Sequence, residues 1–267
     1  MSPDALARFD GVSLEDMVAE AALLARVDRK YVVPKSALGG LLSRVDERTR
    51  VLDIGGARRF AYESVYFDTP DLLSFHMAAQ PRRRRFKLRT RTYVDTHAAY
   101  LEIKTRGARG TTVKERSEYD VAQRAVLTPE AQEEVAAAFA TIGVDSGRVD
   151  ELDATLVTRY ARATLLAPDQ SSRATIDTDL RWDRPDGTGF SLPDLAIVET
   201  KSPSSAPALD RLLWRAGHRP VSVSKYATGL AAMSPELPRN RWGRLLRGPF
   251  SPASTTIHTE ELPCAAA

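Results

Sequence analysis

The sequence predicts an α+β fold built around an antiparallel sheet of eight strands that closes, or nearly closes, into a barrel. Three observations lead to this fold class. Segments of alternating polar and apolar residues recur along the chain, and turns rich in Asp, Gly and Pro separate them. Helix-like segments with recognisable start and stop signals lie between these strands. The 267 residues are 43% hydrophobic and 27% charged, which is ordinary for a globular protein.

The N-terminal part of the chain is predicted to alternate between helix and strand. Residues 13–24 begin with a Ser N-cap and carry Asp three residues later, which is typical of the start of an amphipathic helix. Residues 26–34 are predicted to form a short strand that ends at a proline. A second helix is expected over 34–45, and a strand over 58–71 that ends in a Thr-Pro-Asp turn.

The rest of the domain is predicted to carry six further strands and three further helices. The clearest helix covers 128–143, because it begins with a Thr N-cap and a proline at the first helical position and ends at a glycine. Two more helices are expected over 206–217 and 224–233. The strands are expected over residues 84–94, 98–106, 112–121, 155–166, 173–182 and 194–201.

These elements are predicted to form one domain, residues 1–234. The chain beyond it is rich in Pro, Ser, Thr and Arg. Such a composition buries too little apolar surface to order a chain, so residues 235–267 are predicted to be a largely disordered tail.

Cysteine and histidine usage excludes several kinds of site. The single cysteine, Cys264, rules out an internal disulfide framework and a cysteine-based zinc site, and the four histidines are scattered. Any metal would therefore be held by carboxylates, which favours Mg²⁺ or Mn²⁺. No apolar stretch is long enough to span a membrane, and the N-terminus has no signal-peptide core. A cytoplasmic location is expected.

The segment RRRRFKLRTRTY, residues 82–93, contains seven Arg or Lys side chains and no acid. From Arg85 onward, cations occupy every second position, while Phe86, Leu88 and Thr90 lie between them. Alternate side chains of a strand point to opposite faces, so one face of this strand would be a row of cations. The net charge of the chain is only +3, so this is a local concentration of charge, of the kind that binds anions.

Alternating charge recurs in the other predicted strands. One interpretation is the solvated face of a one-sided sheet. Several strands, however, present mainly Arg and Lys, and neighbouring cations repel one another unless an anion bridges them. A barrel lined in this way would bind a polyanion, because Arg grips phosphate oxygens with a planar fork and Lys supplies a mobile charge. The residues concerned are Asp28, Lys30, Lys87, Arg89, Arg91, Glu102, Lys104, Lys114, Arg116, Arg162, Arg173, Asp177, Glu199 and Lys201.

Nine short segments, taken in order over residues 20–233, carry a family resemblance. They are VDRKY, SVYFDTPD, KLRTRTY, YLEIKTR, VKERSEY, YARATL, RATIDTDL, LAIVETKSP and SVSKYATGL. This series resembles the VTC domain, the polyphosphate polymerase domain of the vacuolar transporter chaperone complex and its bacterial relatives, in the triphosphate tunnel (CYTH-like) superfamily. The resemblance implies an eight-stranded tunnel that uses Mn²⁺ or Mg²⁺ to transfer the γ-phosphoryl group of ATP, or of another nucleoside triphosphate, to polyphosphate.

The resemblance also implies roles for individual residues. Glu199 matches the metal-binding carboxylate. Asp177 and Glu102 are secondary metal candidates by strand position, for which salt bridges to neighbouring cations are an equal alternative. Strand position adds Lys87, Arg116 and Lys201 to the phosphate-binding set. The phosphate-binding residues that match the family's motifs are Lys30, Arg89, Arg91, Lys104, Lys114, Arg162, Arg173 and Lys225. Of these, Arg89, Arg91 and Lys225 are expected to be catalytic.

Two alternatives to a polymerase remain open. The hydrolases of the superfamily begin with an E-x-E-x-K strand, where this chain has Arg26 and Asp28, so the signature of a triphosphatase is incomplete. A non-catalytic module that binds polyphosphate or another polyanion is the other alternative, since Ser222 replaces a lysine of the eukaryotic pattern. Nucleic-acid binding is disfavoured, because the cations do not form an outer patch with stacking aromatic residues. If polymerisation is coupled to transport, a separate membrane protein is expected as partner.

Overall fold

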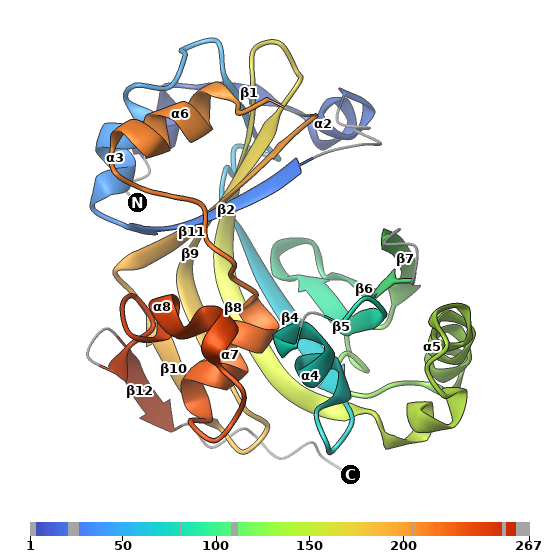
Figure 1. Ribbon diagram of the computed structural model, residues 1–267. Helices are drawn as coiled ribbons and strands as arrows, with labels where there is room; N and C mark the ends of the chain where they lie inside the picture. The colour runs from blue at the N-terminus through green and yellow to red at the C-terminus, as the bar shows by residue number, and fades with distance from the viewer. Residues whose placement is uncertain are drawn as a thin grey trace. The chain divides into compact units, whose positions relative to one another are not determined.

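The computed structural model describes residues 4–20, 27–80, 82–107, 112–203, 205–252 and 255–259. The α+β class with a large, mainly antiparallel sheet is confirmed (Figure 1). The strands are β1 (Asp10–Val12), β2 (Val27–Pro34), β3 (Arg50–Leu52), β4 (Phe60–Asp68), β5 (Arg85–Tyr93), β6 (Ala98–Arg106), β7 (Thr112–Tyr119), β8 (Asp153–Leu166), β9 (Arg173–Asp183), β10 (Thr188–Leu192), β11 (Leu195–Ser202) and β12 (Thr256–Thr259).

The helices lie between these strands, close to the predicted limits where one was predicted. Residues 21–26, which include the end of the first predicted helix and Arg26, lie outside the described residues, as does Cys264. The helices are α1 (Asp4–Ala7), α2 (Leu14–Glu20), α3 (Ala37–Leu42), α4 (Leu73–Ala79), α5 (Pro129–Ile142), α6 (Ala208–Arg215), α7 (Lys225–Met233) and α8 (Gly243–Leu246), with 3₁₀ turns η1 (Val94–Thr96), η2 (Ser146–Glu151) and η3 (Asn240–Trp242).

The sheet differs from the predicted eight-stranded barrel. Within the described residues it has twelve strands, in the order β12-β10-β9-β8-β4-β5-β6-β7, while β11 pairs with β9 and β2, and β3 pairs with β8 and β1. Among the strands predicted to form the barrel, β2 pairs only with β11 and β7 pairs only with β6 in this part of the chain. Closure into a barrel is therefore not confirmed. The strands that were not predicted, β1, β3, β10 and β12, have three to five residues each, too few to show a period.

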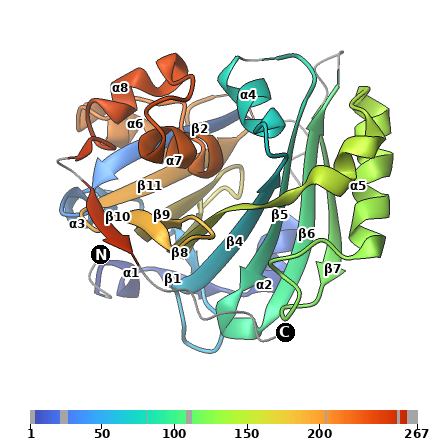
Figure 2. The ribbon, with the colours of Figure 1, turned by 90° about the horizontal axis from the view of Figure 1, so that it is seen from below.

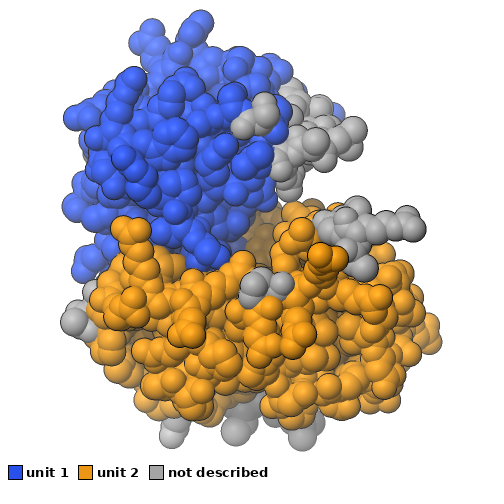
Figure 3. Space-filling view, in the orientation of Figure 1, with its two compact units in different colours: residues 1–61, 160–180, 192–223 blue, residues 62–159, 181–191, 224–267 orange. Residues whose placement is uncertain are grey.

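The chain divides into two compact units (Figure 3). Unit 1 comprises residues 1–61, 160–180 and 192–223, and unit 2 comprises residues 62–159, 181–191 and 224–267. Each unit has its own hydrophobic cluster on one face of its strands.

In unit 1, helices cover the apolar face of β2, β9 and β11. Tyr31 and Ile176 each lie opposite Val198 in the strand register, and all three are buried. Helices α3 and α6 contribute Leu38 and Leu213 to the same cluster. Because side chains alternate along a strand, packing this face of the strands leaves the other face to their polar residues.

In unit 2, α5 covers the apolar face of β4, β5 and β6 (Figure 2). The helix begins as predicted, since Thr128 Oγ1 accepts a hydrogen bond of 3.3 Å from the backbone N–H of Ala131. It ends at Gly143, whose φ of 66° is the left-handed conformation that favours glycine. Phe139 is fully buried and its ring lies 4.5 Å from that of Phe86 on β5.

The structure departs from the disordered tail that composition predicted after residue 234. Trp242 and Phe250 are each 2% exposed, and the Phe250 ring lies 5.5 Å from that of Trp182. On β12, His258 Nε2 lies 2.7 Å from Asp183 Oδ1. The apolar side chains at 242, 245, 246 and 250 follow a helical period that the surrounding Pro and Arg obscured in the sequence. Residues 253–254 and 260–267 lie outside the described part of the chain.

Across the described residues, no helix combines the length and the apolar character that a membrane crossing requires.

Candidate functional site: two cationic strand faces

The alternation predicted from the sequence is present in β5. Phe86 and Leu88 are buried at 3% and 1% exposure, whereas Lys87, Arg89 and Arg91 are half-buried on the opposite face. The neighbouring strand β6 shows nearly the same pattern, with Leu101 and Ile103 buried. We call this polar side the unit 2 face, defined by Lys87, Arg89, Arg91, Glu102, Lys104, Lys114, Arg116 and Lys225.

Strand register arranges the unit 2 face in rows. Lys87 lies opposite Lys104, which lies opposite Lys114, so three lysines form one row across β5, β6 and β7. The next row is Arg89, Glu102 and Arg116. Like charges on directly opposite positions repel one another, so the lysine row is costly unless an anion offsets it.

Arg89 is held on two sides. Its Nε donates to Glu102 Oε2 at 2.8 Å, Nη2 donates to the same oxygen, and Nη1 donates to Tyr66 Oη at 3.0 Å. Arg91 Nη1 lies 3.7 Å from Glu102 Oε1. The Arg116 guanidinium lies 3.5 Å from the centre of the Tyr100 ring, a cation–π contact.

The charges of this face shift two pKa values. Burial alone would raise the pKa of Glu102, but Arg89 and Arg91 outweigh it and lower the pKa to about 2. Burial would likewise raise the pKa of Tyr66, yet Arg89, Lys87 and other nearby cations lower it to about 8. Glu102 is therefore ionised at any working pH, and the Tyr66 phenol titrates just above neutrality.

Helix α7 brings further groups to the unit 2 face. Lys87 Nζ donates to Ser224 Oγ at 2.9 Å, and Ser224 caps the helix that begins at Lys225. Tyr226 anchors this helix, because its hydroxyl donates to the buried Asp68 and its ring stacks 5.2 Å from that of Tyr66. Asp68 also accepts backbone N–H bonds at the start of α4, so one carboxylate positions both helices.

The unit 1 face is the polar side of β2, β8, β9 and β11. Glu199 lies opposite Lys30 on one neighbouring strand and Thr175 on the other. Lys201 donates to Glu199 Oε1, and Lys30 Nζ lies 3.5 Å from the same oxygen. We define this face by Lys30, Arg162, Arg173, Thr175, Asp177, Glu199 and Lys201.

Burial and charge act in opposite directions on the glutamate and its lysine. Burial would raise the pKa of Glu199, but Lys30 and Lys201 hold it well below its usual range. Burial lowers the pKa of Lys201 to about 8, and Glu199 limits that shift. The carboxylate is thus ionised, while the Lys201 ammonium loses its charge in mildly basic solution.

Two arginines of the unit 1 face have different surroundings. Arg162 makes a two-pronged ion pair with the buried Asp177, with N–O distances of 2.6 and 2.8 Å. Arg173 lies opposite Lys201 at the start of β9 and is half-buried. Asp177 is thus engaged by an arginine, as Glu102 is, which corresponds to the salt-bridge alternative considered for both.

Carboxylates do not cluster around either face. In the described residues, no three His, Cys, Asp or Glu side chains group so as to hold a metal ion. Beside Glu199, however, Thr175 Oγ1 is buried and has no hydrogen-bond partner in that part of the chain. One ionised carboxylate and one unpaired hydroxyl fit a Mg²⁺ or Mn²⁺ ion only if phosphate oxygens complete its coordination.

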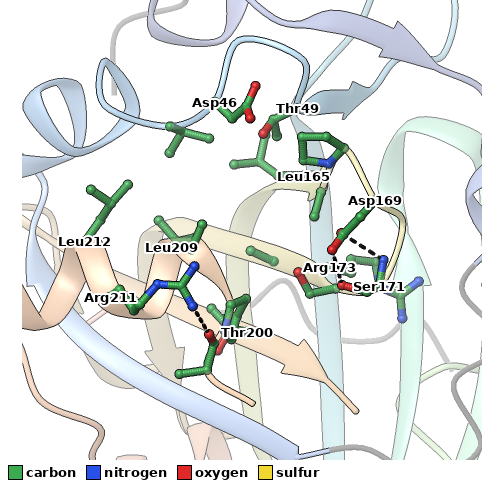
Figure 4. Close-up of a pocket in the computed structure, with 18 of the residues that line it drawn as sticks. Asp46, Thr49, Leu165, Asp169, Ser171, Arg173, Thr200, Leu209, Arg211 and Leu212 are labelled. Carbon is green, nitrogen blue, oxygen red and sulfur yellow. Dashed lines mark hydrogen bonds between the residues drawn. The ribbon is translucent and has the colours of Figure 1, made fainter. Parts of the chain in front are cut away.

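Unit 1 also contains a cavity of about 780 Å³ among α6, the 44–49 loop and the 167–172 turn (Figure 4). Arg173 is the member of the predicted set that lines it. Its polar groups are largely engaged locally, since Arg48 pairs with Asp46 and Arg211 donates to the backbone. The cavity therefore has only Arg173 in common with the unit 1 face, and its arginines Arg48 and Arg211 already have local partners.

The structure divides the predicted site residues between the units. Asp28, Lys30, Arg162, Arg173, Asp177, Glu199 and Lys201 lie in unit 1, and the others lie in unit 2. Sequence reasoning missed Tyr66, Thr175 and Ser224 as site residues. For Tyr66 a signal was present, because Tyr62, Ser64 and Tyr66 alternate along β4 as the cations do along β5.

Comparisons with known proteins bear on the family and the fold. The family model of the VTC domain matches residues 25–234. The structure is similar to that of HpAC1 from Hippeastrum, a protein in which triphosphatase activity is dominant, with 17% identity, a TM-score of 0.51 and coverage of 81% of this chain and 99% of that one. A conserved hypothetical protein from Pyrococcus furiosus aligns with 14% identity and a TM-score of 0.36, over 72% of this chain and 88% of that one. No curated protein matches the chain.

Proposed function

The chain belongs to the VTC domain family, and from this premise we propose that it is a metal-dependent phosphotransferase of the polyphosphate polymerase type. Its substrates would be ATP, or another nucleoside triphosphate, and a polyphosphate chain. The closed eight-stranded tunnel and a separate membrane partner are parts of this proposal that rest on the family resemblance. The limits of the domain at residues 1–234 and a cytoplasmic location are further parts, which rest on the sequence.

The observation that supports the proposal best is the row of Lys87, Lys104 and Lys114 beside the row of Arg89 and Arg116. Phosphates repeat their charge along a chain, so rows of cations at strand spacing suit them. Arg89 is fixed by Glu102 and Tyr66, which orients its guanidinium before any substrate binds. We propose that Arg89, Arg91 and Lys225 hold the reacting phosphates and that the lysine row binds the polymer.

Phosphoryl transfer asks a protein for positioning and charge neutralisation, with no covalent intermediate. In the unit 1 face, Glu199 is the carboxylate that would hold the Mn²⁺ or Mg²⁺ ion. When bound, the metal would neutralise charge on phosphate oxygens held at this face. Lys30 and Lys201 keep Glu199 ionised and place two positive charges next to it. Arg162 and Arg173 would bind further phosphate oxygens.

A triphosphatase is the second candidate, because the Hippeastrum protein of the same fold has that activity. The register places Asp28 opposite Lys201, at the position where the hydrolases carry their second glutamate. The scarcity of carboxylates near Glu199 in the described residues leaves a non-catalytic polyphosphate-binding module as the third candidate.

One assay separates the three candidates. The purified protein is incubated with ATP or inorganic triphosphate and Mn²⁺, and polyphosphate and free phosphate are followed together. A polymerase forms polyphosphate, and this product disappears in Glu199→Ala and Arg89→Ala. A triphosphatase releases phosphate without polymer. A binding module does neither, yet retains polyphosphate in a manner that Arg89→Ala abolishes.

The control for charge removal is Arg48→Ala. Arg48 is exposed, pairs with Asp46 and belongs to neither face. It should match the wild type in every readout. Equal losses in Arg48→Ala and Arg89→Ala would attribute binding to net charge alone and contradict a site on the unit 2 face.

A further inference from the structure

Thr175 differs from the other members of the unit 1 face. Its side chain is 5% exposed, and its Oγ1 has no hydrogen-bond partner within the described residues. A buried hydroxyl left without a partner costs free energy relative to an apolar group of the same shape. Such groups are rare in folded proteins, and each one suggests a partner that the protein chain itself does not provide.

The position of Thr175 indicates what that partner is. Thr175 lies directly opposite Glu199 in the antiparallel register of β9 and β11. Directly opposite side chains share one face of the sheet, with Cβ atoms about 4.5–5.5 Å apart. Within the described residues, the hydrogen bond from Lys201 and the closest approach of Lys30 are both to Glu199 Oε1, so we take Oε2 as the oxygen that faces a cation. A neutral hydroxyl and an ionised carboxylate thus occupy directly opposite positions on the same face of the sheet.

We propose that Thr175 Oγ1 is a second protein ligand of the divalent cation at Glu199. The inference rests on the proposed function, because phosphate oxygens would supply the remaining ligands of a hard cation that prefers oxygen. The hydroxyl coordinates through a lone pair and keeps its proton. It adds no charge, so it does not compete with Glu199 for Lys30 and Lys201 as a second carboxylate would.

Mn²⁺ binding in the presence of the non-hydrolysable ATP analogue AMP-PNP tests the proposal. Free Mn²⁺ is measured by electron paramagnetic resonance for the wild type, Thr175→Val and Thr175→Ser. Valine keeps the shape and removes the hydroxyl, and should weaken Mn²⁺ binding about tenfold. Serine keeps the hydroxyl and should bind Mn²⁺ as the wild type does. An affinity of Thr175→Val equal to that of the wild type would overturn the proposal.

Two controls separate ligation from a structural role. Thr105→Val removes another buried threonine hydroxyl, on the apolar side of β6, and should leave Mn²⁺ affinity unchanged. Thermal melting of the metal-free protein should give an equal or higher melting temperature for Thr175→Val, because an unpaired buried hydroxyl is lost. A lower melting temperature with unchanged Mn²⁺ affinity would assign Thr175 to the fold and overturn the proposal.

Glu199→Gln distinguishes failure of this inference from failure of the proposed function. If Glu199→Gln loses Mn²⁺ binding while Thr175→Val keeps the wild-type affinity, only the role of Thr175 would be overturned. Unchanged binding in Glu199→Gln would overturn the metal site itself. If Thr175→Val folds poorly, the position of Mn²⁺ is determined instead from its anomalous signal in crystals of the wild-type protein. A distance of about 2.1 Å to Thr175 Oγ1 supports ligation, and one beyond roughly 3 Å contradicts it.

Discussion

The two cationic faces use the same strand alternation but hold their central glutamates with different cations. Glu102 of the unit 2 face is held by Arg89 and Arg91, and Glu199 of the unit 1 face by lysines. A guanidinium is a planar fork that stays charged, whereas an ammonium is a compact charge whose pKa responds to burial. The same backbone pattern therefore gives a row of permanently charged guanidinium groups in unit 2, which would suit the proposed phosphate binding, and a carboxylate with titratable neighbours in unit 1.

The largest expected effect is a difference in activity between variants of the two glutamates. Glu199→Gln should lower the rate of ATP consumption with Mn²⁺ by about 100- to 1000-fold, as loss of a key electrostatic group does. Glu102→Gln should lower the same rate only about tenfold, because Arg89 keeps its hydrogen bond to Tyr66. Steady-state kinetics under saturating metal would measure both. Equal losses would mean that the two faces do not differ in role.

The next effect tests the two kinds of cation. Arg89→Lys retains the charge but loses the fork, and should weaken binding of a labelled polyphosphate by about tenfold or more at constant ionic strength. Lys201→Arg also retains its charge and should change the affinity by less than about threefold. Fluorescence anisotropy provides the affinities. Equal polyphosphate affinities of Arg89→Lys and Lys201→Arg would mean that binding does not depend on whether the cation is a guanidinium or an ammonium.

A third prediction concerns stability and compares glycines of the two units. A Cβ at Gly229 of α7 would lie 2.4 Å from Trp182 Cδ1, while one at Gly40 of α3 would have no heavy atom within 4 Å. Gly229→Ala should lower the free energy of unfolding by about 1–3 kcal/mol through overpacking. Gly40→Ala should raise it by about 0.5–1 kcal/mol, since alanine favours a helix. Urea denaturation measures both, and destabilisation by Gly40→Ala would contradict the open surroundings.

The smallest effect is a pH dependence to which each face contributes. Lys201 and Tyr66 both have a pKa of about 8. Below this pH the lysine is charged and the phenol neutral, whereas above it the lysine is neutral and the phenolate negative. Each titration lowers the net charge of its face by one, so polyphosphate affinity should fall about threefold per group between pH 7 and pH 9.

Two variants assign this pH dependence. Lys201→Arg stays charged and Tyr66→Phe stays neutral, so each should remove one part of the decline, and the double variant should bind equally across this range. A full decline in the double variant would place the titrating groups elsewhere.

Some features were predictable because they depend on neighbours in sequence. The alternation of Phe86 and Leu88 with cations predicts β5, and Thr128 with Gly143 predicts both ends of α5. These signals arise from strand geometry and helix caps, which act within a few residues. The positions of the cations on strand faces were available from the sequence for the same reason.

Other features depend on contacts that the sequence does not encode locally. Glu102 lies opposite Arg89 because of the hairpin between β5 and β6, in which η1 is followed by His97 with a φ of 49°. A slip of one residue there would have moved Glu102 to the other side. The bond from Tyr226 to Asp68 joins residues 158 positions apart. Thr175 was recognisable only once the register placed it opposite Glu199.

The row of Lys87, Lys104 and Lys114 also affects how the chain reaches its folded state. Three directly opposed like charges make this sheet harder to assemble in dilute buffer, where little salt screens them. A multivalent anion that binds only the assembled row shifts the folding equilibrium by mass action. If polyphosphate is the substrate, as proposed above, it would thereby also act as a counter-ion for folding, and the melting temperature should rise when phosphate replaces chloride at equal ionic strength.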